Sequence, residues 1–230
     1  MPRYDIVFLD ADNTLFDFDA AEHTALAQAM TERGYPFNEE TEGLYLTVNR
    51  ALWEAFDRGE VDQAFLVVER FRRLVEALGG DHDPARFNDD YLTYLGRSSQ
   101  LLPGAEDLCR DLSRQCRLAL ATNGVARVQY ARLAGSPLGQ YLSGVFISEE
   151  LGAQKPQTAF FDQAFAAMGV ADRSRCVMVG DGLNSDIRGG IAAGIDTIWY
   201  DPKGQTAPPD VRPTYTAHDF DGIRRIILDQ

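Results

Sequence analysis

The sequence predicts an α/β protein with two parts, a parallel sheet covered by helices on both faces and a helical domain inserted near its beginning. Two observations lead to this prediction. After Pro103 and Gly104, short apolar runs alternate with longer amphipathic segments, as in the βαβ units of a parallel sheet. From about residue 19 to residue 97 the chain instead has helical periodicity throughout. We therefore expect a Rossmann-like core formed by residues 1–16 and 99–230, and an inserted α-helical domain at residues 17–98.

Five short apolar runs are predicted to be the strands of the core, at residues 6–9, 118–121, 145–147, 176–179 and 197–199. Helices are expected between and after them, at residues 105–114, 125–133, 158–168, 186–193 and 220–228. Four of the strands are followed by polar residues, namely Asp10, Thr122, Ser148 and Asp181. The carboxyl ends of parallel strands meet at one edge, where open α/β sheets bind their ligands. These side chains should therefore lie along a common edge.

The inserted domain is expected to contain four consecutive helices, because each segment has a start signal and a stop signal. Asp19 followed by Glu22 resembles a capping box at the start of the first helix. Asn38, Asp62 and Asp83 can cap the next three, and glycine follows or ends each segment. The apolar stripe of the second helix is expected to consist of Leu44, Val48, Leu52 and Ala55.

The composition limits the classes of partner. The 230-residue chain is 45% hydrophobic and has a formal net charge of -13, so we expect a globular protein that binds neither a nucleic-acid polymer nor a membrane. A small phosphorylated substrate is still compatible, because a metal ion and one lysine can reverse the sign of the field locally. The chain begins without the apolar segment of a signal peptide. Three cysteines without metal-site spacing indicate reduced thiols in a cytoplasmic protein, expected to be a monomer or a homodimer.

The first chemical motif is Asp10-Ala11-Asp12, directly after the apolar run at residues 6–9. Two carboxylates one residue apart share a face if strand geometry continues, and Mg²⁺ can neutralise such a pair. Asp10 can act as a nucleophile that attacks phosphorus and forms an aspartyl-phosphate. Asp12 can protonate the leaving oxygen and later activate water. The alternative is a strand-end turn with solvated acids, because Asp, Asn and Thr also favour turns.

Three later stretches decide between these interpretations. Thr122-Asn123-Gly124 can form an anion cradle at a strand-to-helix turn, although such a stretch can also be a simple helix cap. Lys155, before a proline, can bind phosphate as a compact charge, although an isolated lysine is more often a surface residue. Asp181 and Asp186 follow the run at residues 176–179 and place two more acids at the expected edge. Asp186 can alternatively cap the next helix, but this does not explain Asp181.

In this order, the motifs Asp-x-Asp-x-Thr, Thr, Lys and Gly-Asp-x-x-x-x-Asp resemble those of the haloacid dehalogenase-like hydrolase superfamily. The resemblance spans almost the whole chain, and the inserted domain is similar to the family's cap of the first type. It implies that Asp10 is the nucleophile and that Asp12 is the general acid and base. It further implies Mg²⁺ as cofactor, held by the carboxylates of Asp10 and Asp181 and by the backbone carbonyl of Asp12.

The resemblance also implies a phosphate site. Thr122, Asn123 and Lys155 would hold the phosphoryl oxygens, and Asp186 would orient metal-bound water or Lys155. Dehalogenases of the family lack the second aspartate of the first motif, so the presence of Asp12 favours phosphoryl transfer over dehalogenation.

Residues 48–53, 58–60 and 147–152 are similar to the corresponding phrases of YjjG-type pyrimidine 5′-nucleotidases. This second resemblance implies a pyrimidine nucleoside 5′-monophosphate as substrate. The residues expected to contact it are Phe16, Phe18, Asn49, Arg50 and Trp53. Trp53 can also simply pack against Phe56. The alternatives are a β-phosphoglucomutase-like mutase or another small-metabolite phosphatase, a 2-haloacid dehalogenase, and a non-catalytic binding module.

Overall fold

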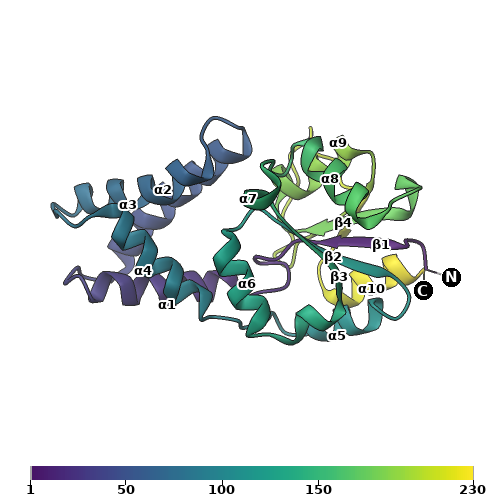
Figure 1. Cartoon of the computed structure of the whole chain (residues 1–230), viewed down its shortest axis with the longest axis horizontal. Helices are drawn as coiled ribbons and strands as arrows, with labels where there is room; N and C mark the ends of the chain where they lie inside the picture. Colours follow the sequence, from purple (N-terminus) through teal and green to yellow (C-terminus); the bar gives the residue numbers. More distant parts are fainter. Residues whose placement is uncertain (1, 230) are drawn as a thin grey trace. The chain divides into compact units, whose positions relative to one another are not determined.

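The computed structural model describes residues 2–229, and these form two compact units (Figure 1). The sheet unit contains the residues up to Asp17 and those from Gln100 onward, while the helical unit is Phe18–Ser99. Within the described residues, no helix is both long enough and apolar enough to cross a membrane.

In its described residues, the sheet unit has a six-stranded parallel sheet, which confirms the predicted α/β class. Its strands are β1 (Ile6–Leu9), β2 (Arg117–Thr122), β3 (Leu142–Ile147), β4 (Cys176–Gly180), β5 (Asp196–Tyr200) and β6 (Tyr215–Ala217). The order is β3-β2-β1-β4-β5-β6, so the sheet grows in opposite directions on the two sides of β1. Ligands bind beyond the carboxyl ends of the strands at such a switch. The sequence did not predict β6, because three residues are too few to show a period.

The helices of the sheet unit cover both faces of the sheet. They are α5 (Ala105–Leu112), α6 (Ala126–Ala134), α7 (Ser148–Leu151), α8 (Thr158–Met168), α9 (Arg188–Ala193) and α10 (Phe220–Leu228). The unit also has two short 3₁₀-helices, η1 (Pro137–Tyr141) and η2 (Arg173–Arg175), and a π-helical turn, η3 (Leu183–Ile187). Figure 1 shows α8 and α9 on one face and α5 and α10 on the other. The predicted helix at 186–193 was wrong in its first turn, because η3 is a π-helical turn and α9 begins only at Arg188.

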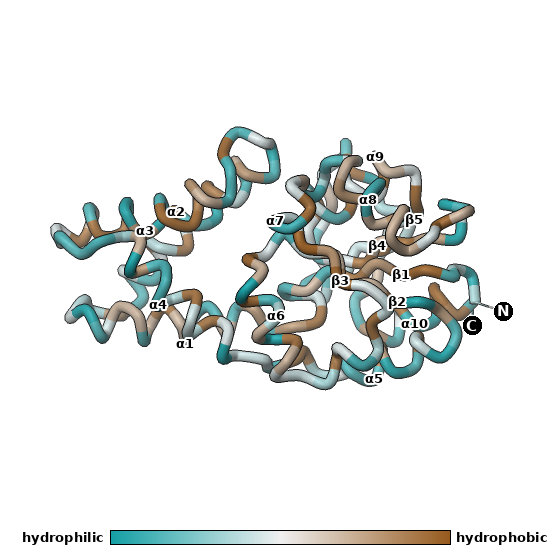
Figure 2. The backbone as a smooth tube through the Cα atoms, in the orientation of Figure 1, coloured by the Kyte–Doolittle hydropathy of each residue, from teal (hydrophilic) through white to brown (hydrophobic). Residues whose placement is uncertain are grey.

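Alternate residues of β1 pack into two separate apolar clusters. Val7 and Leu9 face the cluster that contains α5 and α10, whereas Ile6 and Phe8 face the cluster that contains α8. This is the period of two expected for a strand, and all four side chains are buried because both faces are covered. Figure 2 shows the matching concentration of hydrophobic colour along β1. The sheet therefore holds the end of β1, where Asp10 follows, between two packed layers.

The helical unit consists of α1 (Phe18–Thr31), α2 (Glu39–Asp57), α3 (Gln63–Ala77) and α4 (Pro84–Gly96). The predicted caps of α2, α3 and α4 are confirmed, because the side chains of Asn38, Asp62 and Asp83 accept hydrogen bonds from backbone N–H groups of the first turns. The predicted capping box of α1 was wrong. The helix already begins at Phe18, and Glu22 is buried and accepts hydrogen bonds from two side chains of the helical unit.

The buried face of α2 also differs from the predicted stripe. Its buried residues are Thr41, Tyr45, Asn49, Leu52 and Phe56. Leu44 and Val48 are only half-buried, so the inward face is displaced from the one that hydrophobicity alone indicated. Asn49 belongs to the buried face through hydrogen bonds with polar partners on other helices of the unit.

Candidate active site

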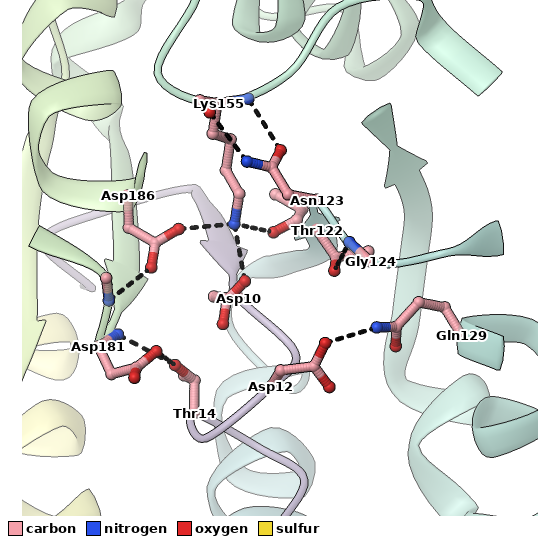
Figure 3. Close-up of polar contacts among 12 residues, drawn as sticks. Asp10, Asp12, Thr14, Thr122, Asn123, Gly124, Gln129, Lys155, Asp181 and Asp186 are labelled. Atoms are coloured by element: carbon pink, nitrogen blue, oxygen red, sulfur yellow. Dashed lines mark hydrogen bonds and ion pairs between the residues drawn. The ribbon is translucent and has the colours of Figure 1, made fainter. Parts of the chain in front are cut away.

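The centre of the site is an ion-pair cluster around Lys155 (Figure 3). Asp10, directly after β1, receives a hydrogen bond of 2.7 Å from the Lys155 ammonium. The same ammonium donates to Asp186 Oδ1 at 2.6 Å and to the backbone carbonyl of Ala121 at 2.6 Å. Lys155 is only 1% exposed, so all three of its N–H donors are used inside the protein. The structure therefore brings the first motif, the second strand and the last motif together at the carboxyl edge of the sheet.

The two later acids occupy the other side of the cluster. Asp186 lies in η3, and its second carboxylate oxygen accepts a hydrogen bond of 2.9 Å from the backbone N–H of Gly182. A side-chain carbon at Gly180 would overlap with the Asp186 carboxylate, so glycine is needed there for space. Asp181 is held through Thr14, whose hydroxyl donates to Asp181 Oδ1 at 3.3 Å and accepts from the Asp181 N–H at 3.1 Å. Thr14 therefore links the first motif to the end of β4.

Burial dominates the electrostatics of the carboxylates. It raises the pKa of Asp10 to about 7 and that of Asp181 to about 7, and the pKa of Asp186 to about 6, although Lys155 opposes the shift in each case. Burial also disfavours the charge on Lys155, but Asp10 and Asp186 outweigh it, so the pKa of the ammonium is raised. The cluster thus has three carboxyl groups and one ammonium, which pairs with Asp10 and Asp186, so acidic groups are in excess.

These residues fit a divalent metal ion. One carboxylate oxygen from each of Asp10, Asp181 and Asp186 can be chosen so that all three lie within 4.8 Å of one another. An all-oxygen donor set with surplus negative charge is the kind that Mg²⁺ prefers. The predicted metal ligands Asp10 and Asp181 belong to this group. The Asp12 carboxylate does not belong to it, and the family resemblance implies only the backbone carbonyl of Asp12 as a metal ligand.

Asp12 has different surroundings from Asp10. Gln129 Nε2 donates to Asp12 Oδ2 at 2.7 Å, and the guanidinium of Arg132 forms an ion pair with Asp12 Oδ1. Figure 3 shows the carboxylate of Asp12 and the amide of Gln129 pointing toward each other, while Asp10 and Asp186 converge on Lys155. The two aspartates of the first motif are therefore held by separate sets of side chains.

Of the predicted phosphate-binding residues, Thr122 and Lys155 lie beside the acidic cluster, whereas the side chain of Asn123 is directed to the backbone of Lys155. The Asn123 amide donates to the Lys155 carbonyl at 2.8 Å and accepts from the Lys155 N–H at 2.9 Å. This pair of hydrogen bonds positions the lysine. The hydroxyl of Thr122 accepts from the Gly124 N–H at 3.0 Å and keeps its own hydrogen for donation.

The predicted specificity residues have unequal access to solvent. Phe16 is completely buried in the core of the sheet unit, and the Arg132 guanidinium carbon lies 4.3 Å from the centre of its ring. Asn49 is buried within the helical unit, where its amide donates to Glu22 at 2.9 Å and accepts from Arg70 at 3.2 Å. The contacts of Phe16 and Asn49 are thus with the protein's own interior, in place of the substrate contact that we expected.

The remaining three specificity candidates are accessible to different degrees. Phe18 is half-buried and Arg50 is exposed. Trp53 is half-buried beside the cluster of Leu52, Phe56 and Leu66, and its ring lies 5.5 Å from that of Phe56 in an edge-to-face arrangement. Trp53 therefore makes the packing contact that the sequence offered as the alternative to a role in binding.

Sequence reasoning did not find Gln129 and Arg132, although both contact Asp12. Their only signal is that two polar residues three positions apart share the buried face of a short helix with Val128 and Leu133. Such a face is expected to be apolar, so a glutamine and an arginine on it indicate a buried polar partner.

The fold and the cluster together define the class, an α/β protein with an acidic, lysine-containing site at the switch point of a parallel sheet. More specifically, the chain belongs to the haloacid dehalogenase-like hydrolase family, whose model matches residues 4–194. This membership confirms the resemblance seen in the motifs and shows that the protein is a hydrolase. The membership and the fold leave the roles of individual residues to be inferred from the geometry.

Two named proteins and one crystal structure are similar to nearly the whole chain. The pyrimidine 5′-nucleotidase PynA of Streptococcus pneumoniae is 37% identical, over 96% of this chain and 93% of its own. The pyrimidine 5′-nucleotidase YjjG of Escherichia coli is 32% identical, over 98% of both chains. The crystal structure of the HAD-hydrolase YfnB of Bacillus subtilis bound to magnesium has a TM-score of 0.92 at 34% identity, and the match covers 97% of this chain and 98% of that one.

Proposed function

We propose that the protein hydrolyses phosphomonoesters through an aspartyl-phosphate on Asp10, with a pyrimidine nucleoside 5′-monophosphate as substrate. The observation that carries the proposal is the pairing of Asp10 with the buried ammonium of Lys155, at 2.7 Å, at the switch point of the sheet. The carboxylate and a phosphoryl group are both negatively charged and repel each other. A fixed positive charge beside the carboxylate reduces this repulsion and lets the two groups approach. Phosphoryl transfer depends mainly on such positioning and charge neutralisation.

The reaction has two steps. In the first, an oxygen of Asp10 attacks phosphorus, the bond from phosphorus to the leaving oxygen breaks, and Asp12 gives its proton to that oxygen. In the second, Asp12 takes a proton from water, the water oxygen attacks phosphorus, and the bond to Asp10 breaks to release phosphate. Thr122 donates its hydroxyl hydrogen to a phosphoryl oxygen, and the Lys155 ammonium provides the neighbouring positive charge. Both aspartates return to their starting state.

We propose Mg²⁺ as the cofactor, held by Asp10 and Asp181, together with the backbone carbonyl of Asp12. When bound, Mg²⁺ supplies positive charge that stabilises the phosphoryl oxygens as charge develops on them. Asp186 is placed to hold Lys155, since the two form a 2.6 Å ion pair in the buried cluster. The excess of carboxyl groups over ammonium groups in this cluster supports the proposal.

The substrate class is supported by the relatives and by Asp12. PynA and YjjG are both named pyrimidine 5′-nucleotidases, and both match this chain over at least 93% of their own length. The presence of Asp12 favours a phosphatase over a dehalogenase, because release of an alkoxide from phosphorus requires a proton donor whereas release of a halide does not. We place the enzyme in the cytoplasm, where the buried free thiols of Cys109, Cys116 and Cys176 would stay reduced.

A panel of substrates tests the proposal. Phosphate release from UMP, dUMP and dTMP should be compared at equal concentration with release from hexose phosphates, phosphoserine and p-nitrophenyl phosphate. The pyrimidine nucleotides should lead by at least about tenfold in kcat/KM, which is about 1.4 kcal/mol of transition-state preference. The Asp10→Asn variant, prepared identically, excludes a contaminating phosphatase. A tenfold lead by a sugar phosphate or phosphoserine would refute the substrate assignment, and the absence of phosphate release from every ester would refute the activity.

A further inference from the structure

We propose that Gln129 and Arg132 of α6 are positioning residues that hold the Asp12 carboxylate in the orientation required for proton transfer. The proposal rests on the proposed function, because it assigns these two side chains a role in the acid and base steps. Both residues lie in the sheet unit, as does Asp12.

The amide of Gln129 is committed to Asp12 at a cost. Gln129 is 1% exposed, and its Nε2 donates to Asp12 Oδ2 at 2.7 Å. Its carbonyl oxygen is buried and has no hydrogen-bond partner among the residues that the structure describes. Leaving a buried acceptor unsatisfied costs about 1–3 kcal/mol. An amide turned the other way would place this oxygen against the carboxylate, so the observed orientation is the one that serves Asp12.

Arg132 holds the other oxygen of the same carboxylate. Its guanidinium pairs with Asp12 Oδ1 and is completely buried, whereas the Asp12 side chain is 25% exposed. The guanidinium also lies over the ring of Phe16, with its carbon 4.3 Å from the ring centre. Phe16 donates its backbone N–H to Ala11 and accepts from the N–H of Asn13, so the ring is anchored in the same turn as Asp12. Gln129 and Arg132, which we call the α6 clamp, are thus held in a fixed position relative to the Asp12 carboxylate.

The glycine of the second motif leaves room for this clamp. Gly124 has no left-handed backbone angle that would require glycine. A side-chain carbon at this position would instead overlap with Gln129 Nε2. The Gln129 amide therefore lies closer to the backbone of Gly124 than a side chain at that position would allow without a shift of the amide.

With one donor on each oxygen, the plane of the Asp12 carboxylate is set by α6. Each carboxylate oxygen can accept more than one hydrogen bond, so both can still exchange a proton with substrate or water. Because misplacement of a reacting group by about 1 Å can cost about 100-fold in rate, an Asp12 that is free to rotate should transfer protons much less efficiently. The loss should be confined to steps that require Asp12.

Kinetics of conservative variants test this inference. Gln129→Met and Arg132→Lys should each lower kcat/KM for an alkyl phosphate such as UMP by about 10- to 100-fold. With p-nitrophenyl phosphate, whose leaving group needs little protonation, kcat/KM should fall by less than about threefold. In the Asp12→Ala background, the same substitutions should cost less than about twofold for either ester, because positioning residues act only through Asp12. Losses that are equal in both backgrounds would overturn the inference and indicate a structural role.

Matched control variants show whether a loss of activity comes from the contact with Asp12 or from the substitution itself. Arg114→Lys and Gln140→Met change exposed residues of the same types in the sheet unit, and both should retain wild-type kcat/KM. Gly124→Ala should reproduce the effect of Gln129→Met in the wild type and add little in a Gln129→Ala background, where the overlap is relieved.

Crystal structures provide a readout that does not depend on activity. The Asp12 carboxylate should keep a single orientation in the wild type and should be displaced or occupy several orientations in Gln129→Met. An unchanged Asp12 in both Gln129→Met and Arg132→Lys would overturn the clamp even if the protein proved not to be a phosphatase. A wild-type enzyme that releases phosphate and depends on Asp12, but is unaffected by the two α6 variants, would overturn the inference and leave the proposed function intact.

Discussion

The buried carboxyl group of Glu22 should make the stability of the helical unit depend on pH. Glu22 is 6% exposed and accepts hydrogen bonds from Asn49 Nδ2 at 2.9 Å and from the Tyr91 hydroxyl at 3.3 Å. Arg70 continues the network with hydrogen bonds to Asn49 and Asn88, so each of α1, α2, α3 and α4 contributes a buried polar group. Burial raises the pKa of Glu22 from 4.5 to about 7, although the charge of Arg70 opposes this shift.

The sign and the size of the effect follow from this pKa. Below pH 4.5 the carboxyl group is neutral in both the folded and the unfolded chain, so its contribution to stability is fully present. Between pH 4.5 and pH 7 the unfolded chain ionises while the folded one does not, and the free energy of unfolding falls. The difference between a pKa of 4.5 and one of about 7 corresponds to a total loss of about 3 kcal/mol.

Replacing Glu22 by glutamine keeps the size and the acceptor oxygen and removes the titration. The variant should therefore gain stability relative to the wild type as the pH rises, by about 2–3 kcal/mol between pH 5 and pH 8. The chain has two tryptophans, Trp53 in the helical unit and Trp199 in β5. Urea unfolding followed by fluorescence in a Trp199→Phe background, with and without Glu22→Gln, then reports on the helical unit through Trp53.

The control is Glu76→Gln, which changes an exposed carboxylate of α3 that pairs with Arg72. It should alter the free energy of unfolding by less than about 0.5 kcal/mol at both pH values. A difference between Glu22→Gln and the wild type that stays constant from pH 5 to pH 8 would refute the reasoning. It would mean that the Glu22 carboxyl group is already ionised in the folded protein.

Three further predictions concern turnover. Asp10→Asn should abolish phosphate release with unchanged circular dichroism, because the amide cannot attack phosphorus; substantial turnover in a folded variant would remove Asp10 from the mechanism. Asp12→Ala should lower kcat/KM by about 10²–10⁴-fold with UMP and far less with p-nitrophenyl phosphate; equal losses with both esters would indicate that Asp12 is structural. EDTA should abolish activity, Mg²⁺ should restore it and Ca²⁺ should restore it poorly, because Ca²⁺ accepts looser and higher coordination; full activity after exhaustive chelation would contradict the metal assignment.

The sheet could be predicted well because short stretches of the sequence are enough to identify its strands. β1, β2, β3 and β4 are short apolar runs with polar residues at or after their carboxyl ends, and the helices between them predict a parallel sheet. What local patterns could not predict was the first turn before α9, because η3 winds as a π-helical turn that points Asp186 inward. The buried carboxylate of Asp186 is paired there with the ammonium of Lys155, which is 31 positions away in the chain.

Lys155 shows the same limit for the candidate site. A lysine before a proline is normally expected at the surface, yet this one is 1% exposed. Its burial depends on Asp10, which is 145 positions away in the chain, and on a backbone carbonyl of β2. The motif pattern could associate Lys155 with the site only by resemblance, because no local property of the sequence distinguishes a buried lysine from an exposed one.

In the helical unit, a polar residue that was expected to contact the substrate instead forms hydrogen bonds inside the protein. Asn49 was expected to contact the substrate, but both ends of its amide are used by Glu22 and Arg70. A single helix cannot reveal this, since the partners lie on α1 and α3. A polar residue that replaces an apolar one on an inward face is therefore as much a sign of a buried network as of a binding site.

The division of the first motif into two environments is what a two-step phosphatase requires. In the proposed mechanism the nucleophile Asp10 must keep a fixed charge partner through both steps, and it has one in the buried ammonium of Lys155. The proposed acid and base, Asp12, must exchange a proton twice, which requires contact with solvent and a fixed orientation. Its side chain is partly exposed and is held at both oxygens. One residue separates the two aspartates, yet one side chain faces the charged cluster while the other meets α6. Sites that assign opposite tasks to neighbouring carboxyl groups achieve this by giving them different surroundings.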